Sequence, residues 1–113
     1  MESNIYYECE DGWLPLIKDA LLIVDNWNLK HNPETLCEFI QIKEKWGKLC
    51  LYLNFYPDEI VDQIHQLENE SLKICEYCGT NKNVNTAKIH RWYRTLCDEC
   101  KLKVYKEYGK SFQ

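Results

Sequence analysis

Long hydrophobic runs, glycine and proline are scarce in this sequence, and each shortage excludes a class of protein. The apolar segment 21–24 is interrupted by Asp25, far short of the roughly 20 apolar residues that a membrane-spanning helix needs. With four glycines and three prolines in 113 residues, the chain has no low-complexity segment. Residues 1–12 lack the basic start and the apolar stretch of a secretory signal, so we expect a cytoplasmic protein.

Residue sets typical of catalysis are also missing. The sequence contains no evident Ser/His/Asp set, phosphate-binding loop or paired-carboxylate pocket. Its three histidines, His31, His65 and His90, fall on three different expected elements. We therefore expect a protein that binds a partner and is not an enzyme.

Charge is divided unevenly along the chain. Residues 1–70 carry 14 acidic and 5 basic side chains, whereas residues 71–113 carry 4 and 9, and the balances of −9 and +5 reproduce the net charge of −4. We expect an acidic α/β body over 1–72 and a basic module over 73–113, packed together as one cooperative unit. The uneven charge is either a partner-binding surface on the module or a means of keeping both parts in solution.

The hydrophobic pattern predicts an α+β protein with three helices, one of them at the end of a C-terminal zinc finger. Apolar residues recur at helical spacing over 13–29 after a capping Asp11, and again over 58–72, where Asp58 is the expected cap. The third helix is expected over 98–109, with the glycine at its end as the stop.

A β-hairpin is expected between the first two helices. Alternation over 39–45 and the apolar segment 49–55 predict two strands joined by a tight turn at 46–48, in which Gly47 supplies a positive φ. A helix is the alternative for the first strand. Residues 1–10 show no regular pattern.

Four of the seven cysteines form the strongest motif in the sequence. Cys75, Cys78, Cys97 and Cys100 are spaced C-x2-C-x18-C-x2-C, so that each pair can turn both thiolates toward one ion. Four sulfurs at about 2.3 Å around a tetrahedral ion are the geometry of structural zinc. Iron is an alternative metal, and His90 is an alternative to one of the cysteines. The order of knuckle, hairpin and knuckle at a helix start resembles a treble-clef finger.

A shell of four cysteines leaves no coordination position for water, so we expect the zinc to stabilise the fold rather than to catalyse. The other cysteines, Cys9, Cys37 and Cys50, have no assigned role. The last two lie on the two expected strands and are expected to be buried free thiols, because a cytosolic disulfide is rare.

Cations alternate with aromatic residues in the expected hairpin of the finger. Lys88, Arg91, Trp92 and Arg94 are candidates for contact with a partner or with nucleic acid. We favour the other interpretation, a hairpin in which Ile89, Trp92 and Leu96 pack inward and the arginine side chains are solvated. A metal-dependent nuclease that uses His90 is a third interpretation.

Aromatic residues are frequent, with four Trp and eight Tyr. Trp13, Trp27 and Trp46 fall on expected apolar faces or turns and are expected to fill the core. By contrast, three tyrosines outside the periodic segments are candidate anchors for a protein partner, namely Tyr6, Tyr7 and Tyr56.

Several of these motifs together resemble a family of small, mostly uncharacterised bacterial and phage-encoded proteins. The shared parts are a tryptophan at the first helix, a K-E-K-aromatic-G turn, a serine at the end of the second helix, a C-x-x-C-G knuckle and an L-C-D segment, here at residues 12–13, 43–47, 71, 75–79 and 96–98. Many members have a histidine where this chain has Cys100. The resemblance implies no established activity.

These observations lead to one principal expectation and two alternatives. We expect a non-enzymatic, zinc-stabilised protein-binding module, and the resemblance implies a phage-encoded inhibitor or adaptor acting on a host defence protein. The first alternative is a zinc finger that binds nucleic acid through its basic C-terminal segment. The second is the nuclease.

Overall fold

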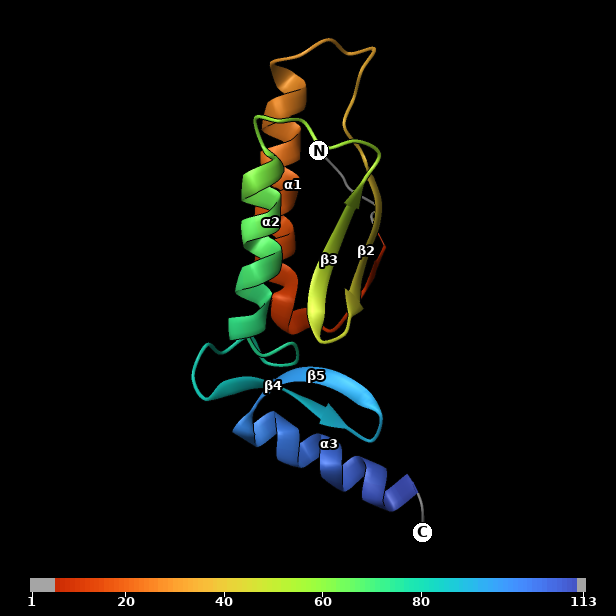
Figure 1. The fold of residues 1–113 in the computed structure, drawn as a ribbon, viewed down its shortest axis with the longest axis vertical. Coiled ribbons are helices and arrows are strands. Elements are labelled where there is room, and N and C mark those ends of the chain that lie inside the picture. The colour runs from red at the N-terminus through yellow and green to blue at the C-terminus, as the bar shows by residue number, and fades with distance from the viewer. Residues whose placement is uncertain (1–5, 112–113) are drawn as a thin grey trace.

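The computed structural model describes residues 6–111, and the side chains of residues 6–107, as an elongated α+β molecule of 56 × 25 × 22 Å. Its elements are shown in Figure 1 and follow the order β1 (Tyr7–Glu8), a 3-10 turn (Asp11–Trp13), α1 (Leu14–Leu29), β2 (Phe39–Lys45), β3 (Lys48–Leu53), α2 (Val61–Glu70), a second 3-10 turn (Ser71–Lys73), β4 (Val84–Ile89), β5 (Trp92–Cys97) and α3 (Asp98–Ser111). None of the helices in this range has both the length and the apolar character needed to cross a bilayer.

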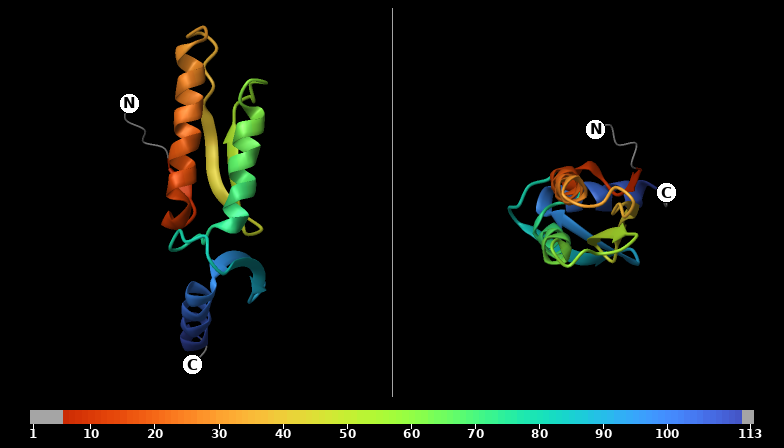
Figure 2. Two further views of the ribbon diagram at one scale, coloured as in Figure 1. Left: turned by 90° about the vertical axis from the view of Figure 1, so that its left-hand side faces the viewer. Right: turned by 90° about the horizontal axis from the view of Figure 1, so that it is seen from above.

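The upper part of the molecule, the body, packs α1 and α2 against one face of the β1–β2–β3 sheet, as Figures 1 and 2 show. Strands β2 and β3 are antiparallel, whereas β1 pairs with β2 in parallel. Alternation on β3 buries Leu49, Leu51 and Leu53 against the helices, as period-two patterning requires. Trp13 and Ile64 are fully buried and bring the two helices into the same core.

The turn between β2 and β3 consists of Trp46 and Gly47, with φ values of 58° and 81°. Two successive positive φ values are typical of the type I′ hairpin turn, which favours glycine at the second position. The expected hairpin is therefore present, with Lys48 in β3, and the alternative of a helix over the first arm is wrong.

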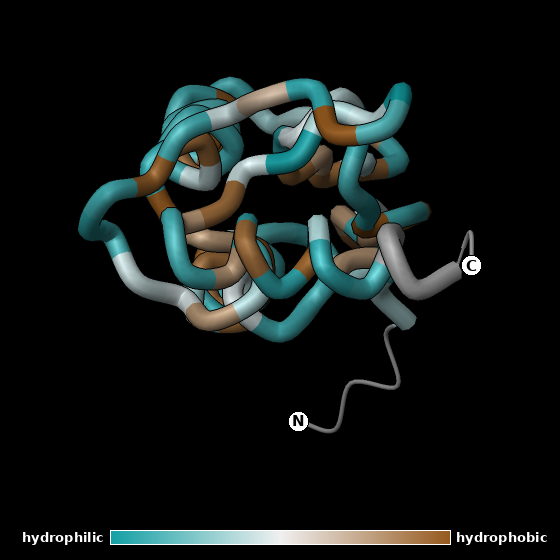
Figure 3. Tube along the Cα trace, turned by 90° about the horizontal axis from the view of Figure 1, so that it is seen from below, coloured by the Kyte–Doolittle hydropathy of each residue, from teal (hydrophilic) through white to brown (hydrophobic). Residues whose placement is uncertain are grey.

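The lower part, the finger, is the antiparallel β4–β5 hairpin with α3 below it (Figure 1). Ile89 pairs with Trp92 across a two-residue turn at His90 and Arg91, both with positive φ. Strand β5 leads directly into α3. Seen from below, hydrophilic residues line much of the outside of the trace (Figure 3).

Several local predictions are wrong. Neither Asp11 nor Asp58 caps a helix, since the helix starts have no side-chain cap bond, and the Asp11 carboxylate instead accepts a hydrogen bond from the Tyr7 hydroxyl at 2.9 Å. Helix α3 passes through Gly109 and ends at Ser111. Glycine is only a weak stop when no C-cap motif follows it.

Two tryptophans expected in the interior lie at the surface. Trp46 is 70% exposed and Trp92 is 61% exposed, whereas Trp13 is buried as expected. Trp27 is half-buried, and its indole N–H donates to the Glu59 carboxylate at 3.1 Å. Both exposed tryptophans lie at or beside hairpin turns, where a side chain points away from either core.

Candidate metal centre

The structure brings Cys75, Cys78, Cys97 and Cys100 together at the junction between body and finger. Cys75 follows the second 3-10 turn, Cys97 is the last residue of β5, and Cys100 lies in the first turn of α3. The four sulfur atoms all lie within 4.8 Å of one another. The predicted cysteine cluster is thus confirmed as a group suited to holding a metal ion.

The first pair forms a tight knuckle. Gly79 has φ of 83°, and its N–H donates to the Cys75 carbonyl at 2.9 Å, which closes the loop. The Cys78 N–H points at Cys75 Sγ at 3.5 Å, and the Cys100 N–H points at Cys97 Sγ at 3.4 Å. Backbone N–H groups aimed at sulfur favour the thiolate, which is the form that binds metal.

Sulfur spacing also fits a tetrahedral ion. Cys78 Sγ and Cys97 Sγ are 3.7 Å apart, and ligands at about 2.3 Å from a tetrahedral centre are separated by about 3.8 Å. A disulfide would need a separation of about 2.05 Å. All four cysteines are free, and three are buried while Cys78 is exposed.

The electrostatics of the cluster favour a cation. Burial raises the pKa of Cys75, but the N–H groups around it outweigh burial and lower the pKa to about 7. Burial and the neighbouring Cys97 and Cys75 sulfurs raise the pKa of Cys100. The Thr80 backbone lowers the pKa of Cys78, yet burial and the adjacent sulfurs leave it raised. The first thiolate of the cluster therefore forms easily, and its negative charge then opposes proton loss from the remaining thiols. A divalent ion would offset that charge.

The body fits closely around the first knuckle. A Cβ on Gly12 would lie 2.2 Å from the Cys75 carbonyl oxygen, and the Gly12 N–H donates to the Glu76 carbonyl at 2.7 Å. The Trp13 indole N–H donates to the Ile74 carbonyl at 2.9 Å. The metal site therefore also joins the first helix to the finger.

Glu76 is a buried carboxylate that the sequence did not point to. It is 1% exposed, its Oε2 accepts the Glu10 N–H at 3.1 Å, and Arg94 Nη1 lies 3.9 Å from Oε1. Burial raises the pKa of Glu76. Arg94, a predicted contact residue, is thus engaged in an ion pair inside the molecule.

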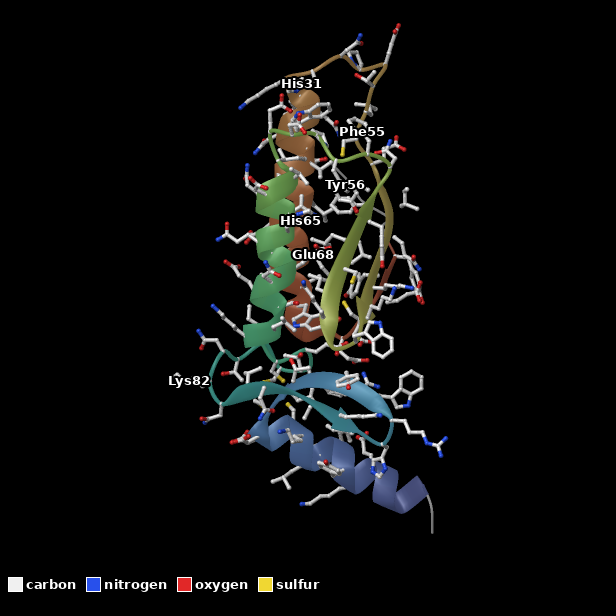
Figure 4. The ribbon with its side chains drawn as sticks, in the orientation of Figure 1. His31, Phe55, Tyr56, His65, Glu68 and Lys82 are labelled. Atoms are coloured by element: carbon white, nitrogen blue, oxygen red, sulfur yellow. The ribbon has the colours of Figure 1, made fainter. Side chains whose placement is uncertain are left out.

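The histidines do not gather into a second metal site. His31 stacks on Trp27 with ring centroids 3.9 Å apart, His65 lies beside Tyr56, and the His90 ring contacts Tyr105 at 5.8 Å. Figure 4 shows His31 and His65 at different levels of the body. Within the described residues, His90 does not belong to the cysteine cluster.

The three predicted tyrosine anchors have different environments. Tyr6 is 78% exposed, whereas the Tyr7 hydroxyl is bonded to Asp11. The Tyr56 hydroxyl donates to the Leu51 carbonyl at 2.9 Å and accepts from the Leu53 N–H at 3.2 Å. In Figure 4, Tyr56 lies between β3 and α2. Of the three, only Tyr6 presents most of its side chain to solvent.

The other three cysteines are free, as expected for Cys37 and Cys50, but these two do not lie on facing strands. Cys37 precedes β2 and is buried, with its thiol directed at the Phe55 carbonyl at 3.4 Å. Cys50 lies on β3 opposite Lys43 and is only half-buried, so its expected burial is wrong. Burial raises the pKa of both, and of Cys9, so all three favour the neutral thiol.

No protein-family model, curated protein or solved structure matches this chain.

Proposed function

We propose that this protein is a non-enzymatic binding module in which structural zinc, held by Cys75, Cys78, Cys97 and Cys100, stabilises a treble-clef-like finger that docks, with the body, on another protein. The order of knuckle, hairpin and knuckle at a helix start supports the treble-clef interpretation. Four thiolates complete a tetrahedral shell, and such sites stabilise structure. Any activity then comes from the outer surface.

Exposed large aromatic side chains carry the proposal of a protein partner. Tyr6, Trp46 and Trp92 are 78%, 70% and 61% exposed. Trp and Tyr are among the residues that contribute most to protein–protein binding, and folding alone gives no reason to place them in water. The resemblance to phage-encoded proteins suggests a host defence or regulatory protein as the partner.

The proposal is tested in two steps. Native mass spectrometry should find one zinc ion per chain, and a mass without metal would contradict the structural role. The zinc-loaded protein is then used to capture proteins from a host lysate, and each candidate is purified and titrated against it. A candidate that rebinds with a micromolar or lower Kd supports the function, and the absence of any that rebinds contradicts it.

Nucleic-acid binding is a second candidate, favoured by the cations exposed on the β4–β5 hairpin. Lys88, Arg91 and Trp92 are all exposed at or near the turn between β4 and β5, and these residue types suit phosphate contact and base stacking. The candidate predicts salt-sensitive binding of an oligonucleotide that weakens when Lys88 and Arg91 become Ala. No shift in mobility at low salt would eliminate it.

A further inference from the structure

The tip of the β2–β3 hairpin lies against one face of the β4–β5 hairpin. The buried Thr95 hydroxyl donates to the Gly47 carbonyl at 2.5 Å, and Thr95 is also bonded to Thr86 at 2.6 Å. Because alternate strand residues share a face, the next pair along, Lys88 and Tyr93, faces the same way. Two segments far apart in the sequence therefore meet at this point.

Exposed side chains from both hairpins form a joint surface beside this contact. The Trp46 ring lies 5.8 Å from the Tyr93 ring, and Lys88 Nζ lies 6.0 Å from the Tyr93 ring centroid. Tyr93 is 41% exposed. We call this surface the hairpin junction. It consists of the exposed residues Lys45, Trp46, Lys88 and Tyr93 and the half-buried Lys48.

The backbone conformation of Trp46 is unfavourable for its side chain. Its φ of 58° is left-handed, which is rare for a bulky residue, and type I′ turns favour Asn, Asp or Gly at this position. The side chain also remains mostly exposed, so burial does not offset the strain. A strained, exposed tryptophan is placed for contact with something outside the chain.

The junction also concentrates positive charge. Lys45 and Lys48 form a directly opposed pair next to the turn, and like charges in that position oppose each other. Within residues 6–107, no ion pair involves either of them. The acidic residue beside the turn, Glu44, directs a carboxylate oxygen at the Gly47 N–H at 2.7 Å. Lys88 adds a third ammonium group from the finger.

We propose that the hairpin junction binds an acidic segment of a protein partner, with Trp46 and Tyr93 as the aromatic contacts. This inference rests on the proposed function and names its surface. An acidic peptide segment complements the local charge, and the aromatic rings suit a partner's apolar side chains. A long nucleic acid would also meet the acidic body, where residues 1–70 have a charge balance of −9.

Selection from a displayed library of random peptides tests the proposal, with the zinc-loaded full chain as bait. Enriched peptides should carry net negative charge, and fluorescence anisotropy of labelled copies should show binding that weakens as salt rises. Neutral or basic enriched peptides would overturn the proposal, as would enrichment no greater than on a Trp46→Asn bait. A labelled oligothymidylate that binds more tightly than every enriched peptide would overturn it in favour of nucleic acid.

Matched variants locate the binding surface. Trp46→Asn places a residue favoured by the turn, so it should fold at least as well while weakening peptide binding about tenfold. Replacing Lys45 and Lys48 with Gln should have a similar effect and flatten the salt dependence. Leu29→Ala is the control, because Leu29 is 83% exposed but lies at the end of α1 that is far from the finger (Figure 1). Lys30→Gln controls for charge. Thermal melts confirm that each variant folds.

The two proposals fail in different ways. If a purified partner binds the wild type and Trp46→Asn equally, the junction is overturned while the protein-binding function stands. The junction is also overturned if Leu29→Ala weakens peptide binding as much as Trp46→Asn does. If neither a partner nor any peptide binds, both proposals fall.

Discussion

The body and the finger have cores of different kinds. The body buries a continuous apolar cluster from α1, α2 and two strands, centred on Trp13, Ile42, Leu51 and Ile64. The buried cluster of the finger is much smaller, and three of its six residues are candidate metal ligands. It consists of Cys75, Ile89, Leu96, Cys97, Cys100 and Val104. The body can be stabilised by burial alone, whereas the smaller core of the finger would gain most from a metal ion held by the cysteine cluster.

Metal removal should produce the largest difference in stability between the body and the finger. A strong chelator should unfold the finger, since structural zinc contributes on the order of 10 kcal/mol to folding of such modules. Amides of β4 and β5 should lose hydrogen-exchange protection, while Leu51 and Ile64 keep it. The metal-loaded protein should unfold in a single transition. If β4 and β5 keep their exchange protection in protein shown to be metal-free, the two cores do not differ in their need for metal.

Gly12→Ala should damage the contact between the regions. Its Cβ would lie 2.2 Å from the Cys75 carbonyl oxygen, and overpacking of this kind costs about 3 kcal/mol, measured by urea unfolding of the metal-loaded protein. Gly79→Ala is a graded comparison: its Cβ would lie 3.2 Å from the Gly12 carbonyl oxygen, so the expected cost is mainly the positive φ, about 1 kcal/mol. Equal losses would show that the close fit at Gly12 is unimportant.

Thr95→Val should weaken the second contact, between the hairpins. The change removes the donor to the Gly47 carbonyl and leaves a buried acceptor unsatisfied, at a cost of about 1–2 kcal/mol. Thr95→Ser keeps the hydroxyl and should retain most of the stability. If valine proves as stable as serine in thermal melts, the hydrogen bond does not hold the two regions together.

The smallest expected effect concerns a thiol of the body. Burial, with help from nearby acids including Glu76, raises the pKa of Cys9 from 9.0 to about 12. The folded state therefore favours the neutral thiol. Its contribution to stability is present below the unfolded pKa and declines as pH rises from 9 toward 12. The free energy of unfolding, measured with urea at about pH 8 and about pH 10, should fall more steeply with pH for the wild type than for Cys9→Ser. Equal declines in the two proteins would contradict the raised pKa of Cys9.

Local patterns in the sequence predicted the elements well because they depend on neighbouring residues. Helical spacing located α1 and α2, and the alternation over 39–45, the apolar segment 49–55 and Gly47 located the first hairpin. The caps at Asp11 and Asp58 were wrong, because capping depends on side-chain orientation in the folded chain. The short strand β1 has too few residues to produce a pattern.

By itself, the sequence determined which four cysteines gather, because the spacing within each pair fixes how two thiolates can turn toward one point. Only the tertiary structure decided where that centre lies and what surrounds it. The fit of Gly12 against Cys75 and the meeting of Trp46 with Tyr93 join residues more than 40 positions apart. Such contacts depend on how whole elements pack, and no local spacing encodes that packing.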